Sequence, residues 1–107
     1  MYTITAVCGS GVGSSMFARK AITTAVANLG YDMKEITVTC VGAAEGKGAA
    51  RETDIFICAG KNIAERLIGT GVPTCVARNF VNDVAGITEA IKPLLEADEA
   101  LGKVKKA

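Results

Sequence analysis

The feature that most constrains this chain is a glycine-rich loop that joins a strand pattern to a helical pattern within residues 2–29. Residues 3–8 are mostly apolar and β-branched, as in a strand that a parallel sheet buries on both faces. The helical pattern after the loop has one apolar stripe, formed by Ala18, Ile22, Ala25, Val26 and Leu29. Gly30 is the predicted end of this helix, because glycine readily adopts the left-handed conformation that closes a helix. The order strand, loop, helix therefore predicts an α/β fold.

The loop itself has the composition of an anion-binding site. It comprises Cys8 followed by Gly9, Ser10, Gly11, Val12, Gly13, Ser14 and Ser15. Glycines let the backbone curl until successive amides point at one anion, and the first amides of a helix lack intrahelical partners. Ser14 or Ser15 is the predicted N-cap, and the serine hydroxyls add further donors. We therefore predict that residues 9–15 bind phosphate.

Cys8 is the candidate nucleophile of this loop. A helix N-terminus lowers the pKa of a cysteine thiol from about 8.5 into the range of roughly 3.5–7.5. The amides that stabilise the thiolate also stabilise a phosphoryl group once it is attached to the sulfur. The alternative is that Cys8 is a small buried hydrophobic residue at the end of a strand. The composition of the loop favours the first interpretation, a cysteine that carries a phosphoryl group.

The rest of the chain continues the alternation of strands and helices. Runs of apolar and β-branched residues predict three further strands, at 34–41, 54–59 and 73–77. A short helix is predicted at 63–68. The small residues of 42–48 predict at most a weak helical turn, which begins at Ala43.

The last helix is marked by an apolar stripe of Ile87, Ile91, Leu94 and Leu95. Pro93 lies within this stripe, and this predicts a kink or a restart of the helix, because proline lacks the amide that an uninterrupted helix uses. Residues 97–107 are polar. They are predicted to form a frayed tail after a single domain of residues 1–96.

These elements predict a three-layer, Rossmann-like fold in which helices flank a four-stranded parallel sheet. The expected strand order is 2-1-3-4, which places the switch point between strands one and three. The loop at Cys8 and a turn of Gly60, Lys61 and Asn62 then open at the same edge. Polar residues that follow the third and fourth strands are candidates for a place beside the site. They are Lys61, Asn62, Arg78 and Asn79.

Composition excludes several classes of function. The net charge is only +1, and the 107 residues contain no basic stripe, so nothing indicates a nucleic-acid partner. No apolar run approaches the roughly 20 residues of a membrane span. The N-terminus also lacks the basic and apolar segments of a signal peptide. We therefore expect a cytoplasmic protein.

The chain contains no histidine, which removes Cys-His and Ser-His-Asp catalysis. Any phosphohistidine must belong to another protein. Cys40, Cys58 and Cys75 form no C-x-x-C pair with each other or with Cys8, so we expect neither a metal site nor a cofactor. Each of the three lies in a strand pattern and is predicted to pack in the core, with oxidative pairing as a minor alternative.

Other phosphate-binding motifs fit this loop poorly. A Walker loop requires lysine after its last glycine, whereas Ser14 follows Gly13, and the dinucleotide fingerprint fails from Gly9 and from Gly11. The loop of low-molecular-weight tyrosine phosphatases needs an arginine six positions after its cysteine to clamp phosphate. Ser14 occupies that position, which favours a site that hands phosphate on over one that hydrolyses it. Asp83, in a late loop, stays open as a candidate acid.

The segments from Ala6 to Met16 and from Val76 to Asn79 carry a resemblance to a known family. The chain resembles enzyme IIB components of the bacterial phosphoenolpyruvate-dependent sugar phosphotransferase system, and most of all the ascorbate-type branch of the galactitol/lactose superfamily. The similarity in layout extends over residues 2–96. It also implies a fold like that of low-molecular-weight tyrosine phosphatases.

The resemblance implies that Cys8 accepts a phosphoryl group from a phosphohistidine on a IIA partner. Cys8 would then pass the group to a sugar, ascorbate or a related one, held by a IIC membrane permease. Two alternatives stay open from the residues alone. One is a cysteine-loop phosphatase or an enzyme like arsenate reductase, and the other is a regulatory module that senses an anion.

Residues just beyond the loop also bear on partners. Arg19 and Lys20 either attract a phosphorylated or acidic surface or are simply solvated. Met16 and Phe17 either form an apolar rim for docking or pack in the core.

Overall fold

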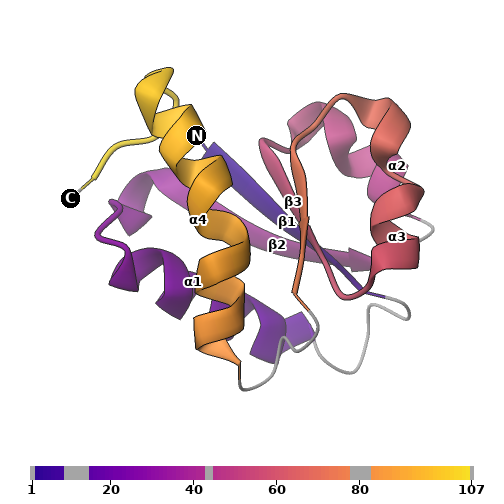
Figure 1. Cartoon of the computed structure of the whole chain (residues 1–107), viewed down its shortest axis with the longest axis horizontal. Coiled ribbons are helices and arrows are strands. Elements are labelled where there is room, and N and C mark those ends of the chain that lie inside the picture. Colours follow the sequence, from indigo (N-terminus) through magenta and orange to yellow (C-terminus); the bar gives the residue numbers. More distant parts are fainter. Residues whose placement is uncertain (1, 9–14, 43–44, 78–82, 107) are drawn as a thin grey trace.

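The structure, a computed structural model, describes residues 2–8, 15–42, 45–77 and 83–106 (Figure 1), with Cys8, Ser15 and Met16 described by their backbone alone. The elements follow the chain as β1 (Tyr2–Cys8), α1 (Ser15–Asn28), η1 (Met33–Glu35), β2 (Ile36–Gly42), α2 (Gly46–Ala49), η3 (Ala50–Glu52), β3 (Ile55–Cys58), α3 (Lys61–Glu65), η4 (Ile68–Thr70), β4 (Thr74–Val76) and α4 (Val84–Ala100).

The four strands form one parallel sheet in the order β2-β1-β3-β4, which confirms the predicted α/β fold and strand order. β1 is central and pairs along its whole length with β2, from Tyr2 opposite Ile36 to Cys8 opposite Gly42. On its other side β1 pairs with β3, and the last pair joins Val7 to Cys58.

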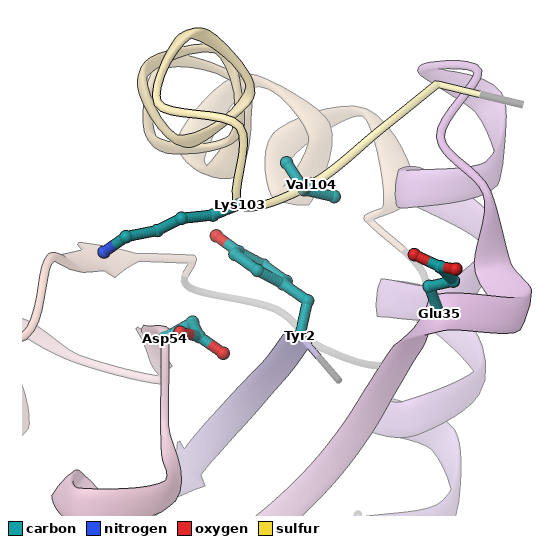
Figure 2. A pocket seen from close by; sticks show the side chains of 5 residues that line it. All are labelled: Tyr2, Glu35, Asp54, Lys103 and Val104. Carbon is teal, nitrogen blue, oxygen red and sulfur yellow. The ribbon is translucent and has the colours of Figure 1, made fainter.

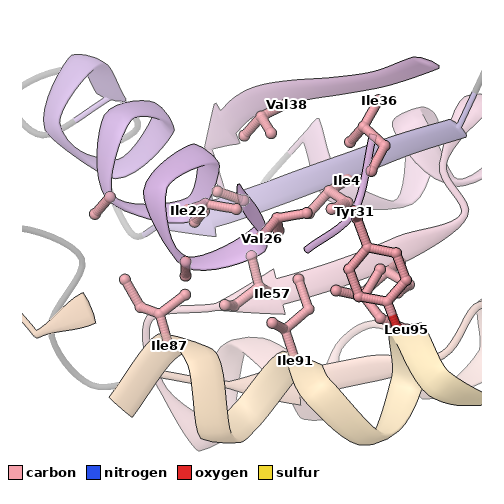
Figure 3. Packing of buried hydrophobic residues seen from close by; sticks show 14 of the residues in the cluster. Ile4, Ile22, Val26, Tyr31, Ile36, Val38, Ile57, Ile87, Ile91 and Leu95 are labelled. Carbon is pink, nitrogen blue, oxygen red and sulfur yellow. The ribbon is translucent and has the colours of Figure 1, made fainter. Parts of the chain in front are cut away.

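Helices cover both faces of the sheet, α1 and α4 on one and α2 and α3 on the other (Figure 1). Since side chains alternate along a strand, each face has its own core. Figure 3 shows the larger one, in which Ile22 of α1 and Ile87 of α4 meet Ile57 of β3. The smaller core consists of Val7, Phe56, Cys58 and Leu67, with partly buried residues of α2 and α3 around it.

The apolar stripe of α1 has the predicted role. Ala18, Ile22, Ala25 and Val26 are buried, and Leu29 is partly buried against the same core. Gly30 follows the helix with a φ of 91°, and its N–H donates to the carbonyl of Ala27 at 3.0 Å. This left-handed residue ends the helix as expected.

Several boundaries differ from the predicted ones. β2 begins at Ile36 rather than 34, because Asp32 caps a 3₁₀ turn at Met33–Glu35 by accepting a hydrogen bond from the Lys34 N–H. β3 and β4 are each one residue shorter at both ends than predicted. The helical turn expected from Ala43 lies outside the described residues at its start, and α2 is described from Gly46.

The short helix was predicted at 63–68, with Lys61 and Asn62 in a turn. It instead occupies Lys61–Glu65, with Gly60 as its N-cap. The Gly60 carbonyl accepts a hydrogen bond from the Ala64 N–H at 3.2 Å and so starts the helix earlier. A 3₁₀ turn then follows at Ile68–Thr70.

The restart predicted at Pro93 is wrong, because α4 continues through it from Val84 to Ala100. Pro93 lies on the exposed side of the helix, where water can hydrogen-bond the carbonyl that the missing amide leaves free. On the other side of the helix, Ile87, Ile91 and Leu95 are fully buried before and after this point. Their packing keeps the two halves in one continuous helix, and the kink at Pro93 stays a prediction.

The frayed tail predicted from residue 97 is also wrong for residues 97–106. Asp98 is only 5% exposed and accepts a hydrogen bond from the Tyr2 hydroxyl at 2.6 Å. Val104 is buried in the larger core, and the last described residues pair with Tyr31 through an antiparallel bridge. The tail therefore belongs to the fold, because contacts distant in sequence hold it at the amino end of β1.

We predict that Tyr2→Phe destabilises the protein by about 1–3 kcal/mol, because it leaves a buried Asp98 oxygen without its donor. Urea unfolding measures this change. Tyr31→Phe is the matched control, since its hydroxyl donates only a 3.4 Å hydrogen bond to Glu99, and we expect a loss of less than about 0.5 kcal/mol. Equal losses of stability in the two variants would contradict the larger stabilising role assigned to the hydrogen bond between Tyr2 and Asp98.

Candidate functional site

The candidate site lies at the edge of the sheet where the parallel strands end. Cys8 is the last residue of β1, opposite Gly42 and one residue beyond the pair of Val7 and Cys58. The Ala59 N–H donates to the Val7 carbonyl oxygen at 3.0 Å. The chain that leaves β3 is therefore held next to the end of β1.

The chain leaves these two neighbouring strands toward opposite faces of the sheet. α1, which follows β1, packs on one face, and α3, which follows β3, packs on the other (Figure 1). This divergence is the switch point at which open parallel sheets bind ligands. The backbone of Cys8 stands at this point, as the topology predicted.

The predicted phosphate loop falls largely outside the described residues. Gly9, Ser10, Gly11, Val12, Gly13 and Ser14 lie outside them, and Ser15 is the first residue of α1. α1 has 14 residues and no acidic side chain in its first turn, so its dipole and free amides place partial positive charge just after the loop.

The structure places half of the residues predicted to lie beside the site. Lys61 and Asn62 form the first turn of α3 at the same edge, and both side chains are exposed. The Asn62 side chain folds toward Gly60, where an added Cβ would lie 3.0 Å from Asn62 Oδ1. Arg78 and Asn79 lie outside the described residues, directly after Ala77.

A match to a known protein family identifies the class of protein to which this site belongs. The model of the family described as PTS system, Lactose/Cellobiose specific IIB subunit matches residues 3–90. The chain belongs to this family. A search of curated proteins found no match.

The chain is thus a IIB component of a sugar phosphotransferase system, a transferase that acts in sugar transport. The match confirms the resemblance to IIB components, and the matched residues include Cys8, α1, the strands β2, β3 and β4, and all of β1 except Tyr2. The placement in the ascorbate-type branch stays a prediction. The description of the matched family names lactose and cellobiose.

The three other cysteines of this IIB protein pack as predicted, and Cys58 and Cys75 form no disulfide. Cys58 is completely buried in the smaller core, and Cys40 and Cys75 are partly buried against the larger one. Burial raises the pKa of the Cys58 thiol to about 11. Burial, together with the nearby Cys58, raises the pKa of Cys75 to about 12. Neutral thiols are poor nucleophiles, so neither Cys58 nor Cys75 is a candidate nucleophile.

Sequence reasoning missed a groove on the α2 side of the sheet. The hollow has a volume of about 380 Å³ and is lined by Thr3, Thr5, Thr37, Thr39, Val41, Ala49, Glu52 and Thr53. It shows that this face of β2 is only partly covered, because Thr37, Thr39 and Val41 are partly exposed. Thr5 and Val7 of β1 are buried on the same face, so the predicted cover of β1 on both faces is confirmed from Ile4 to Val7. The short α2 leaves the groove open, and alternating threonines at 3–5 and 37–39 were its signal in the sequence.

The threonine hydroxyls in this groove form an ordered chain. The Thr53 hydroxyl donates to the Ala49 carbonyl at 2.7 Å, so its oxygen accepts from Thr5, also at 2.7 Å. The Thr5 oxygen then accepts from Thr39 at 3.2 Å. The buried Thr5 and Thr53 hydroxyls are thereby satisfied within the sheet.

A second hollow lies at the opposite edge of the sheet from Cys8. Figure 2 shows the side chains that line it, which are Tyr2, Glu35, Asp54, Lys103 and Val104. They come from the amino ends of the strands and from the folded tail, and the hollow has a volume of about 250 Å³. It is therefore separate from the candidate site. Within the described parts of the chain, no group of acidic or cysteine side chains could hold a metal ion.

None of the helices in the described residues combines the length and the apolar character that crossing a bilayer requires.

We predict that iodoacetamide at pH 8 alkylates Cys8 first. Cys58 and Cys75 should react at least about 100-fold more slowly than an ordinary cysteine. The reason is that raising the pKa from 9.0 to about 11 leaves about one hundredth of the thiolate at that pH. Mass spectrometry of timed samples measures each site, and the urea-unfolded chain, in which the thiols react alike, is the control. Fast labelling of Cys58 or Cys75 in the folded protein would refute this ranking.

Proposed function

We propose that Cys8 is the residue of this IIB protein that carries the phosphoryl group. The donor is a phosphohistidine on a IIA partner, and the acceptor is a sugar held by a IIC membrane permease. The observation that carries this proposal is the position of Cys8, at the end of the central strand where α1 and α3 diverge. Family membership supports the same reaction class.

The chemistry consists of two transfers. In the first, the Cys8 sulfur attacks phosphorus, an S–P bond forms and the N–P bond of the phosphohistidine breaks. The thiol proton ends on the imidazole that leaves. In the second, a sugar hydroxyl oxygen attacks the same phosphorus, the S–P bond breaks and the hydroxyl proton returns to the sulfur.

The surrounding residues have supporting roles in this proposal. The amides of residues 9–15 and the start of α1 stabilise first the thiolate and then the phosphoryl dianion. Ser14 replaces the arginine clamp of a phosphatase, so the group is held weakly enough to be passed on. Lys61, Asn62, Arg78 and Asn79 are proposed to assist from beside the site. The first turn of α3, which contains Lys61 and Asn62, supports this role for those two residues.

The location and the sugar complete the proposal. A IIB protein that meets a IIA partner and the inner face of a permease works in the cytoplasm, and the Cys58 and Cys75 thiols, which form no disulfide, agree with a reducing compartment. For the sugar we propose ascorbate or a related compound. A transfer assay with permease vesicles and a panel of ascorbate, lactose and cellobiose tests this choice directly.

We predict that incubation with a histidine-phosphorylated IIA protein labels this chain at Cys8 alone. Peptide mapping of the labelled protein locates the phosphorylated residue. The Cys8→Ser variant should take up no label. Cys75→Ala is the matched control and should keep the label, because the Cys75 thiol is neutral and lies within β4, before the carboxyl ends of the strands.

Two results would overturn the proposal. One is label on another residue, or label that persists in Cys8→Ser. The other is rapid hydrolysis of an aryl phosphate by the wild-type protein, which would instead indicate a cysteine-loop phosphatase.

A further inference from the structure

The outer surface of α1 differs from the rest of the chain in its charge. The whole chain is nearly neutral, but the 14 residues of α1 contain Arg19 and Lys20 and no acidic residue. Both basic side chains are exposed. They lie within the first two turns of the helix, close to the loop that begins after Cys8.

Phe17 adds an apolar anchor to this surface. Its side chain is 58% exposed, so the structure places it on the surface and not in the core. An exposed phenylalanine in the first turn of a helix that leaves a reactive loop is typical of a contact residue, because aromatic anchors supply much of the energy of protein interfaces.

Two hollows follow this surface, and together we call them the α1 groove. The first, of about 220 Å³, lies between α1 and the start of α4 and is lined by Phe17, Lys20, Ala21, Thr24 and Val84. The second, of about 370 Å³, adjoins it and is lined by Arg19, Lys20, Thr23 and Thr24. Lys20 and Thr24 line both hollows, so the two hollows of the α1 groove lie side by side along the helix.

Resting on the proposed function, we propose that the α1 groove docks the IIA phosphoryl donor. An apolar side chain of the donor fits beside Phe17 and Val84, and acidic residues around it face Arg19 and Lys20.

Charge selects the donor over the permease as the occupant of the α1 groove. A phosphorylated donor approaches with a charge of about −1.5 to −2 on its phosphoryl group, which Arg19 and Lys20 attract. The cytoplasmic loops of membrane proteins carry an excess of lysine and arginine, which the same two residues repel. After transfer, the phosphoryl charge belongs to the IIB protein itself, so the attraction falls and the donor leaves.

The test measures the rate of Cys8 phosphorylation against the concentration of a histidine-phosphorylated IIA protein of the lactose/cellobiose class. Phe17→Ala and Lys20→Glu should each raise KM about tenfold or more and change kcat less than twofold, because they remove binding and leave the chemistry intact. Added salt should raise the wild-type KM more than that of Lys20→Glu.

Lys92→Glu on α4 is the matched control, because it makes the same charge change at an exposed position two helical turns beyond Val84. Its KM should stay within twofold of the wild-type value. Phe17 and Lys20 are exposed, so both variants should melt within a few degrees of the wild type, which thermal unfolding checks.

The outcomes separate this inference from the function on which it rests. Normal labelling of Cys8 with unchanged KM in both variants overturns the docking inference and leaves the function standing. Variants that load normally but pass phosphate slowly to sugar in permease vesicles also overturn it, and assign the α1 groove to the permease. Failure of the wild-type protein to take label at Cys8 overturns the function and the inference with it.

Discussion

The rest of this structure depends on the pairing of β1 between two parallel neighbours. Backbone hydrogen bonds hold β1 to β2 and β3, and the chain leaves β1 and β3 toward opposite faces of the sheet. A parallel sheet brings all carboxyl ends to one edge, so the backbones of Cys8, Gly42 and Ala59 lie together there. The backbone of Cys8 is therefore fixed by the pairing of β1, which agrees with the role proposed for this residue.

The two faces of the sheet are covered unequally, and this has chemical consequences. The long helices α1 and α4 cover one face with a continuous apolar core, whereas the shorter α2 and α3 leave part of β2 open. Buried threonines on the open side satisfy one another through hydroxyl hydrogen bonds and so replace apolar cover. Burial also keeps the Cys58 and Cys75 thiols protonated, so these two cysteines are poor nucleophiles.

Stability and reactivity are separated along the strands. The amino edge holds the buried hydrogen bond between Tyr2 and Asp98 and the folded tail, and the carboxyl edge holds Cys8 and the start of α1. Lys106 places its ammonium group 5.4 Å from the centre of the Tyr31 ring and adds to the closure of the amino edge. The contacts that close the fold therefore lie at the edge of the sheet opposite Cys8.

The amino-acid sequence by itself determined the fold class, the strand order, the stripe and end of α1 and the place of Cys8. Each of these follows from local periodicity, from glycine conformation or from the connection rules of parallel sheets, so residues close in sequence carry the signal. Only the tertiary structure decided that Asp98 pairs with Tyr2, that α4 continues through Pro93, that Phe17 is exposed and that a groove opens beside the threonines. These depend on contacts between residues distant in sequence, or on how far one helix reaches over its neighbours. A polar tail or an apolar helix residue has no local pattern that reveals which surface it will meet.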